Sequence, residues 1–281
     1  MRMRARQRLT ALFLVALLSG CEQVVELGTL PFEEKLVVRA VLQADSAVEV
    51  YFTRTFSLNQ TYSPEQGVID NVDASIVNDG ISYPLTYAGQ VVRGRIGTGF
   101  ARYTANLLVA KPNKVYELFA KWNGHQLHAT TIVPDSTVID TAFAILDSTQ
   151  GYYYGNAVYN SMVAIRPSPN LAYFVQYQQL TNPYYYTFFS IGPKRTTSTG
   201  EQLIFDPTFY LPPKWEDSLQ AVVYCFDHAF YDYFRTRSNS YGISSIGIFG
   251  DSPGNVIWNV EGEAIGMFIG TSVSKKKVFV P

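Results

Sequence analysis

The chain has 281 residues, with 22 Lys and Arg against 23 Asp and Glu, so its formal net charge is −1. A nucleic-acid-binding protein of this size normally carries a clear basic excess, so this balance argues against nucleic acid as a partner. Hydrophobic residues make up 47% of the chain, which excludes a disordered polypeptide, and two Cys and three His leave little for a disulfide-rich scaffold or a metal centre.

The first twenty residues are typical of an export signal. Four arginines within the first eight positions precede an apolar run over 9–18, about half the length that a bilayer-spanning helix needs. The run ends in Leu18-Ser19-Gly20-Cys21, which resembles the lipobox of bacterial lipoproteins. This resemblance implies cleavage between Gly20 and Cys21, a diacylglyceryl group on the Cys21 sulfur, and acylation of the new N-terminus.

A lipid anchor at Cys21 would hold the mature chain on a membrane. Each buried CH2 of an acyl chain contributes about 0.8 kcal/mol, so several chains give stable attachment. Glu22 stands where an Asp often marks retention at the inner membrane, so we expect the outer membrane, in either leaflet. The alternative is an ordinary signal peptide with an accidental Cys. We disfavour it because the positive charges, the apolar run, the small residues and the Cys all stand at the spacing of a lipoprotein signal.

After a lipidated tether at 21–35, the chain predicts strands separated by turns. β-Branched and alternating apolar residues indicate strands over 36–42, 48–53, 72–77, 81–87, 91–96 and 100–108. Asn78-Asp79-Gly80 indicates a hairpin turn, and a second hairpin joins 115–122 to 125–133 through Asn123-Gly124. This many short strands in about 100 residues predicts an immunoglobulin-like β-sandwich domain over 36–134.

The Asn123-Gly124 turn also sets the register of its hairpin, because a type I′ turn places the flanking residues opposite each other. The expected pairs on one face, which we expect to be buried, are Trp122 with His125, Ala120 with Leu127, Leu118 with Ala129, and Tyr116 with Thr131.

Residues 135–281 predict a second β-rich domain. Strands are expected near 138–146, 158–166, 171–180, 185–191, 203–206 and 220–226, with closing strands at 265–273 and 278–280. Apolar residues from Phe226 to Phe234 recur on one helical face, which indicates an amphipathic helix that Asp227 could cap. Lys275-Lys276-Lys277 indicates a solvated turn that protects an edge strand. The expected fold is mainly β: two β-sandwich-like domains, the first immunoglobulin-like, with one amphipathic helix in the second.

The order of several short motifs resembles a family of Bacteroidota lipoproteins, the domain of unknown function numbered four-two-four-nine. The motifs cover nearly the whole mature chain, and besides the lipobox they are 35–40, 72–80, 115–118, 129–134, 259–262 and 266–270. The resemblance implies two β-rich domains at the outer membrane, in a family often encoded beside TonB-dependent receptors. It supplies no catalytic residue.

The residues that could carry chemistry do not form a recognisable site. His125 and His128 are three apart, but on a strand they point to opposite faces and cannot chelate one ion. His228 beside Asp227 is a weaker metal candidate, which we expect on the exposed side of the helix. Apolar neighbours favour a packed, unreactive Cys225 over a nucleophile at a helix N-terminus. We therefore expect no metal, no cofactor and no enzymatic activity.

Two clusters of tyrosine are the strongest candidates for a ligand-binding surface. A tyrosine offers a large contact area, little rotamer entropy and a polar tip, which suits binding. The alternative is that these rings fill the core of a sandwich. The residues are Tyr152, Tyr153, Tyr154, Tyr184, Tyr185 and Tyr186.

Three functions remain open at this point. The leading hypothesis is a non-enzymatic outer-membrane lipoprotein that acts as a binding or accessory partner, and the family resemblance implies a TonB-dependent receptor that takes up an unknown ligand. The alternatives are a surface-exposed hydrolase that acts on a polymer, and a structural or adhesive surface protein.

Overall fold

The computed structural model describes residues 32–57, 60–93, 98–150, 152–153, 156–179, 190–195, 200–206, 208–211, 219–236 and 256–280. From Glu34 onward the chain forms one compact unit. The expected signal peptide and Cys21 lie outside the described residues. Within the described ranges, no helix is both long enough and apolar enough to cross a membrane.

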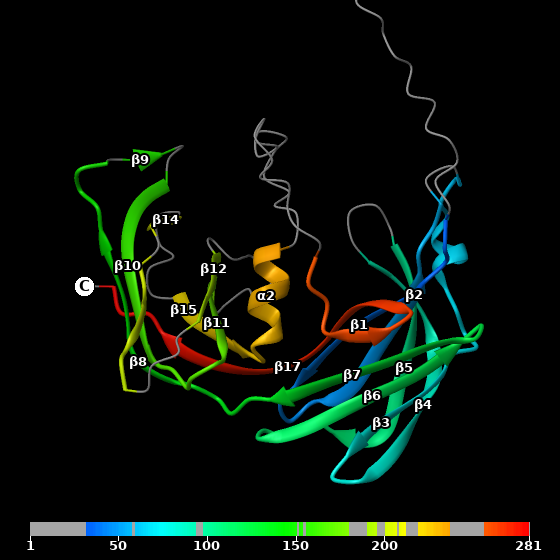
Figure 1. Cartoon of the computed structure of the whole chain (residues 1–281). Helices are drawn as coiled ribbons and strands as arrows, with labels where there is room; N and C mark the ends of the chain where they lie inside the picture. The colour runs from blue at the N-terminus through cyan, green and yellow to red at the C-terminus, as the bar shows by residue number, and fades with distance from the viewer. Residues whose placement is uncertain are drawn as a thin grey trace, which may run out of the picture. The chain divides into compact units, whose positions relative to one another are not determined.

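Seven strands of the N-terminal half build the first sandwich-like body (Figure 1). They follow one another in the sheet as β1-β2-β5-β4-β3-β6-β7. Their bounds are β1 (Leu36–Gln43), β2 (Ala47–Arg54), β3 (Asp73–Asn78), β4 (Ile81–Arg93), β5 (Thr98–Val109), β6 (Lys114–Trp122) and β7 (His125–Val133), with the short 3-10 helix η1 (Pro64–Gly67) after β2.

The strand expected at 91–96 is not a separate element. Its residues 91–93 are the end of β4, which pairs with β5 on both sides of a register shift between Tyr87 and Gln90, and residues 94–96 lie outside the described residues. A bulge of this kind lets one long strand bend without leaving its ladder. The sequence signal had split the strand at the bulge.

The hairpin of β6 and β7 has the predicted turn and register. Asn123 and Gly124 have φ of 46° and 84°, as a type I′ turn requires. Trp122 lies opposite His125 and Tyr116 opposite Thr131, with the intervening pairs as expected. This face is buried: Leu118 is 0% exposed.

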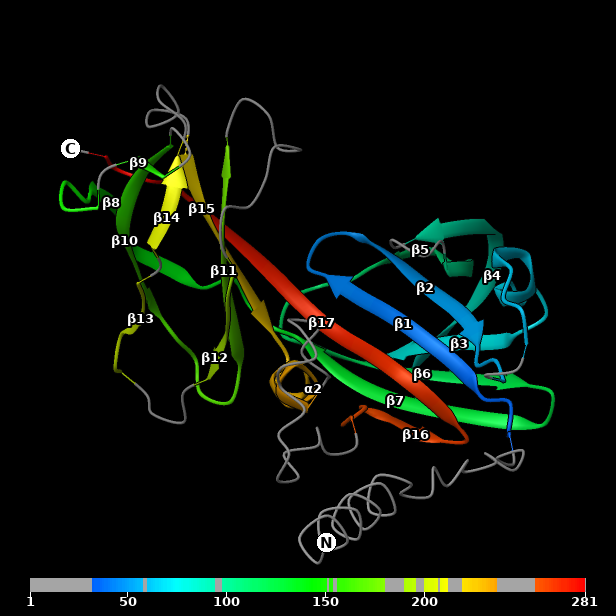
Figure 2. The same ribbon diagram turned by 90° about the horizontal axis from the view of Figure 1, so that it is seen from above.

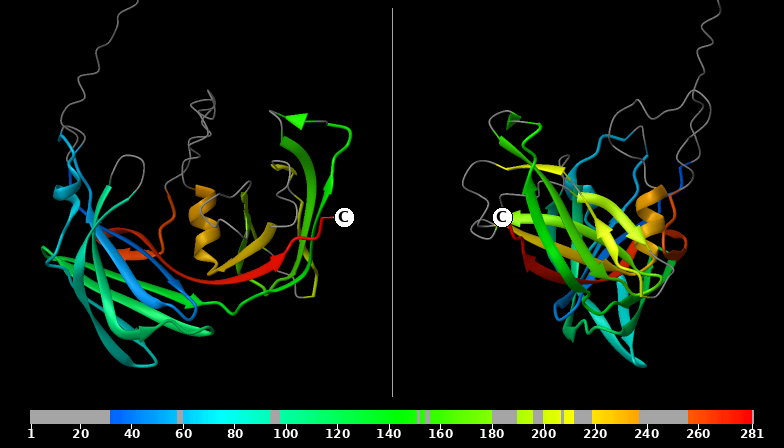
Figure 3. Two further views of the ribbon diagram at one scale, coloured as in Figure 1. Left: turned by 180° about the vertical axis from the view of Figure 1, so that it is seen from behind. Right: turned by 90° about the vertical axis from the view of Figure 1, so that its left-hand side faces the viewer.

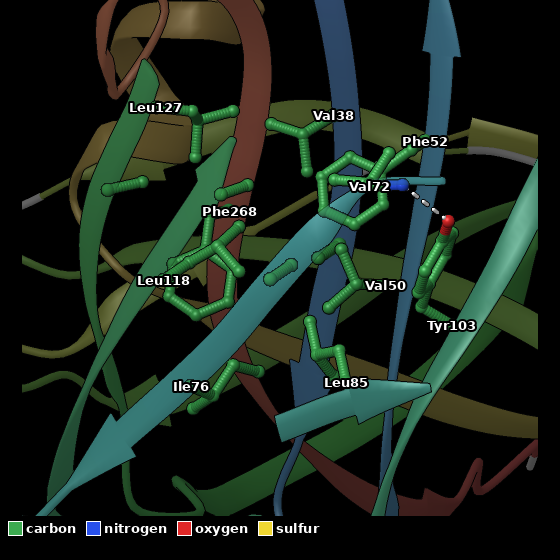
Figure 4. Packing of buried hydrophobic residues seen from close by; sticks show 14 of the residues in the cluster. Val38, Val50, Phe52, Val72, Ile76, Leu85, Tyr103, Leu118, Leu127 and Phe268 are labelled. Carbon is green, nitrogen blue, oxygen red and sulfur yellow. Dashed lines mark hydrogen bonds between the residues drawn. The ribbon is translucent and has the colours of Figure 1, made fainter. Parts of the chain in front are cut away.

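The core of the first body lies inside its curled sheet (Figure 4). Val38, Phe52 and Leu118 come from the N-terminal strands, whereas Phe268 comes from the far end of the chain. The hydroxyl of Tyr103 accepts a hydrogen bond from the Val72 amide at 2.9 Å and donates to the Ile69 carbonyl at 3.1 Å. A buried hydroxyl satisfied in this way adds no unpaired polar group to the core.

The second body is a sandwich of two layers. One layer holds β8 (Val138–Leu146), β9 (Tyr152–Tyr153), β10 (Asn156–Arg166), β13 (Leu203–Phe205) and β14 (Thr208–Leu211). The other holds β11 (Ala172–Gln179), β12 (Ser190–Arg195), β15 (Leu219–Phe226) and part of β17 (Ala264–Lys277). Side chains from both layers, including Tyr159, Tyr177 and Phe205, share one core. The remaining elements are α2 (Ala229–Thr236) and β16 (Val260–Gly262). The structure thus confirms the mainly β fold with two sandwich-like bodies.

The last strand, β17, belongs to both bodies (Figure 2). Its first half, from Ala264 to Thr271, runs parallel to β1, and Ala264 and Phe268 enter the first core. Its second half, from Thr271 to Lys277, pairs antiparallel with β15. One continuous strand therefore joins the two cores.

The prediction of a turn at Lys275-Lys276-Lys277 is wrong, because these residues end β17 and pair with β15. Their side chains are exposed while their backbone stays in the ladder, so a run of charge does not by itself end a strand. The Lys276 ammonium donates to the carbonyls of Ile139 and Asp140, at 3.0 and 2.6 Å.

Two other expected strands are described in part or differ. Residues 185–189 of the strand expected at 185–191 lie outside the described residues, and Ser190–Arg195 forms β12. At 278–280 the chain forms a single bridge to β8, between Phe143 and Phe279. β14 and β16 were not expected from the sequence.

A buried carboxylate joins the two bodies where β7 meets β17. Asp227 is 3% exposed, and its Oδ2 accepts hydrogen bonds from the Thr131 hydroxyl at 2.7 Å and the Ile132 amide at 2.9 Å. The Thr131 hydroxyl in turn accepts from the Gly270 amide at 2.8 Å, and the Asp227 amide donates to the Gly270 carbonyl at 3.1 Å. We call these residues the Asp227 junction.

Removal of the carboxylate should destabilise the protein. Asp227→Ala removes the carboxylate that accepts from the buried Thr131 hydroxyl and from the Ile132 amide. We therefore expect a loss of about 3 kcal/mol in the free energy of unfolding, measured by urea titration. Asp232→Ala is the control, because the Asp232 carboxylate pairs, among the described residues, with Arg235 alone, at 3.6 Å within the same helix. Equal midpoints for the two variants would contradict the role of the junction.

Gly270 should tolerate no side chain. A Cβ added there would lie 2.1 Å from the Ile132 carbonyl oxygen, and both strands are fixed by the junction. We therefore expect Gly270→Ala to lower the melting temperature strongly, as seen by circular dichroism. Thr130→Ala, at an exposed neighbouring position of β7, should leave it unchanged. A stable, native-like Gly270→Ala protein would show that the strands do not approach this closely.

Candidate functional site

An apolar groove of about 450 Å³ lies on the outer face of β1 and β17, next to α2. This volume falls within the range of small-molecule binding sites. Its described lining is almost wholly apolar or aromatic, and we call it the aromatic groove. The lining side chains used below are Val37, Arg39, Val41, Phe226, Phe230, Tyr233, Trp258, Met267 and Ile269.

The floor of the aromatic groove follows from strand alternation. In β1, Leu36, Val38, Ala40 and Leu42 are buried in the first core, so the residues between them face outward. The parallel register sets Val37, Arg39 and Val41 beside Ile265, Met267 and Ile269 of β17. Met267 and Ile269 are only 9% and 2% exposed although they point away from the core, because other elements cover this face.

The helix α2 contributes Phe230 and Tyr233 to one wall of the groove. The ribbon of α2 is the orange helix in Figure 3. Asp227 caps its start, as expected, because its Oδ1 accepts from the Ala229 amide at 3.3 Å. Phe230 stacks on Phe226 of β15, with ring centroids 4.0 Å apart. No residue of α2 is fully buried, so the aromatic face of this helix contributes to the groove rather than to a closed core.

The segment at 256–259 forms a second wall, which contacts α2. Trp258 lies with its ring centroid 5.5 Å from that of Tyr233. The side-chain amide of Asn259 donates to the Phe268 carbonyl at 2.5 Å and accepts from the Phe268 amide at 2.9 Å, as a neighbouring strand would. The Ile257 amide donates to the Thr236 hydroxyl at 2.9 Å. These bonds fix the wall to β17 and to α2.

Arg39 supplies the charge of the site. It is the only charged residue among the described residues that line the aromatic groove. Its side chain is exposed and makes no hydrogen bond or ion pair with another described residue. As far as the structure describes it, the groove therefore combines an apolar and aromatic lining with a cation that has no described partner.

A second hollow, of about 600 Å³, lies over β3, β6, β7 and β16. There the ring of His128 stacks on Phe119, with centroids 4.7 Å apart, between two carboxylates. Its Nε2 lies 3.3 Å from Glu117 and its Nδ1 3.4 Å from Glu261. These contacts join β16 to its neighbours. The polar side chains in this hollow therefore have a structural role, in holding β16 to the sheet.

The histidines are arranged as their strand register requires. His125 lies on the Trp122 face and interacts with Glu263 at 3.0 Å, whereas His128 lies on the Phe119 face. Within the described ranges, no three potential ligands come together to hold a metal ion. His228 is exposed, with its Nδ1 2.6 Å from Asp227 Oδ1.

Cys225 is packed, as expected. It is 1% exposed, and burial raises the pKa of its thiol to about 12. A thiol with so high a pKa is almost fully protonated at neutral pH and is a poor nucleophile.

The structure leaves the tyrosine clusters as predictions. Tyr152 and Tyr153 form β9, whose backbone pairs with Ala157 and Asn156 of β10. Tyr154, Tyr184, Tyr185 and Tyr186 lie outside the described residues, as do Gly20 and Cys21.

The sequence did not reveal the aromatic groove, although two of its signals were visible. The alternation around Arg39 and the aromatic helical face at Phe230 can both be read from the sequence. What brings them together is the pairing of β1 with β17, between segments more than two hundred residues apart. No local pattern specifies such a contact.

The comparisons with known proteins do not assign a family. No family model and no curated protein matches the chain. A DUF4785 family protein from Legionella pneumophila is 13% identical with a TM-score of 0.19, and 68% of this chain and 52% of that chain are covered. A marsupial T cell receptor is 13% identical with a TM-score of 0.23, and the match covers 69% of this chain and 92% of that chain. The match thus spans about half of the bacterial protein.

The wall at Trp258 should depend on Asn259. Asn259→Ala leaves the Phe268 amide and carbonyl without their partner, so we expect faster hydrogen exchange at Phe268 and Ile257 and a loss of about 1 to 2 kcal/mol in stability. Gln202→Ala is the control, because that exposed side-chain amide donates to Asp140 at the surface and does not line the groove. Unchanged exchange at both amides would mean that the wall is held by other contacts.

Proposed function

We propose that this chain is an outer-membrane lipoprotein, anchored through Cys21, that binds a ligand without transforming it. In this proposal it acts as the accessory partner of a TonB-dependent receptor during uptake. The observation that carries the binding role is the aromatic groove. Its two walls are fixed by a hydrogen bond that Asn259 donates and by bonds that Thr236 and Asp227 accept. The lipobox and the family resemblance support the anchor and the receptor.

A binding role fits the groove better than catalysis does. A hydrolase needs a nucleophile or activated water beside a general acid or base. The described lining of the aromatic groove offers Arg39 and the Tyr233 phenol as its polar side chains, and neither is an acid or base suited to neutral pH. Aromatic side chains instead supply contact area and orientation for a ligand.

The anchor is tested by Cys21→Ala. We expect the native chain to take up radiolabelled palmitate in cells and to stay in the outer-membrane fraction. The Cys21→Ala chain should carry no label and should leave that fraction. Cys225→Ala is the matched control, because a buried thiol should not affect lipidation. Labelled or equally membrane-bound Cys21→Ala protein would contradict the anchor.

The receptor is tested separately, by affinity capture of the tagged full chain from solubilised outer membranes. We expect a TonB-dependent receptor among the recovered proteins, in amounts that follow those of the chain. Failure to recover any transporter of this class would contradict the partnership while leaving the groove as a binding site.

A further inference from the structure

We propose that the aromatic groove binds a small anionic amphiphile, with an apolar or aromatic body held between the walls and a carboxylate held by Arg39. This inference rests on the proposed binding function and adds the chemical class of the ligand. It comes from the combination of the Arg39 guanidinium, which pairs with no described residue, with the mainly apolar and aromatic side chains that the structure describes around it.

Arg39 lies in the floor of the groove, in the middle of β1. On the β17 side its neighbour in register is Met267, and on the β2 side it is Tyr51. Both neighbours are buried, at 9% and 8% exposure, so Arg39 lies between two well-packed side chains. On the β2 side Arg39 also borders another hollow, whose lining includes Gln43 and Glu49. A ligand that covers the floor of the groove would remove water from around the charge and strengthen its attraction to an anion.

The acidic residue that shares this other hollow with Arg39 makes no ion pair with Arg39. Glu49 of β2 faces the same outer surface but accepts a hydrogen bond from the Tyr51 hydroxyl and lies 3.7 Å from the Arg102 guanidinium. Glu49 is thus shared between two other groups. Its ion pair with Arg102 offsets its charge, so the net charge of these three ionised groups is +1 from Arg39.

A carboxylate suits this cation by geometry as well as by charge. The planar guanidinium presents paired N–H donors that match the two oxygens of a carboxylate, which an amide or a hydroxyl cannot do. The stacked rings of Phe226 and Phe230 and the Trp258 ring then provide faces for the apolar body. A neutral ligand would leave the cation without a partner beneath it.

The test uses the full chain in lipid nanodiscs, so that no detergent competes for the groove. Binding of radiolabelled 4-phenylbutyrate and of its neutral analogue, 4-phenylbutanamide, is measured by equilibrium dialysis against empty nanodiscs. We expect the native chain to bind the carboxylate about tenfold more tightly than the amide, because a paired charge is worth that much in a partly desolvated site.

Variants separate the charge from the groove. Arg39→Gln should abolish the preference for the carboxylate, and Arg39→Lys should restore part of it, because an ammonium keeps the charge but not the paired donors. Arg235→Gln is the matched control, since Arg235 lies on α2, pairs with Asp232 and does not line the groove. Phe230→Ala and Tyr233→Ala should weaken both probes together, in protein whose circular dichroism spectrum shows that it is still folded.

The outcomes distinguish the two levels of the proposal. Equal affinities for both probes, or a preference for the carboxylate that survives Arg39→Gln, would overturn the proposal of an anionic ligand. The binding function would still stand in that case if the wall variants weaken the binding of both probes. If neither probe binds the native chain, or if folded wall variants bind both probes as the native chain does, the binding function of the groove is overturned as well.

Discussion

The structure depends on one buried carboxylate that connects segments far apart in the chain. Asp227 accepts from Thr131 and Ile132 of β7, donates through its own amide to Gly270 of β17, and caps α2. A buried carboxylate is costly unless both of its oxygens accept hydrogen bonds. Here each oxygen of Asp227 accepts at least one. The same network therefore fixes where β17 passes from the first core to the second and where α2 begins.

The aromatic groove is a consequence of this connection. β17 brings Met267 and Ile269 beside the outward-facing residues of β1, and the helix that starts at Asp227 places Phe230 above them. Because the floor and one wall are both set by the junction, a change there would reach the groove without touching its lining. The arrangement couples the stability of the fold to the shape of the site, which favours a preformed site over one assembled by the ligand.

The sequence predicted the local features well and the distant ones poorly. The hairpin register around Asn123-Gly124 and the helix with its cap at Asp227 follow from rules that act over a few residues. The pairing of β1 with β17 does not, since a strand pattern shows which residues face inward but not which strand lies alongside. Asp227 could be read as a helix cap, but its bonds to Thr131 and Ile132 join positions almost a hundred residues apart. The sequence likewise could not show that Arg39 lies in a groove, because the other lining residues come from distant segments of the chain.

The junction can be tested most directly by a double-mutant cycle between Thr131→Val and Asp227→Ala, with free energies of unfolding from urea titration. The two side chains are both buried and are joined by a hydrogen bond of 2.7 Å. The effects of the two substitutions on the free energy of unfolding should therefore not add. The account predicts a coupling energy of about 1 to 3 kcal/mol. Additive effects, within the error of the four measurements, would show that the two strands are held together by something else and would contradict it.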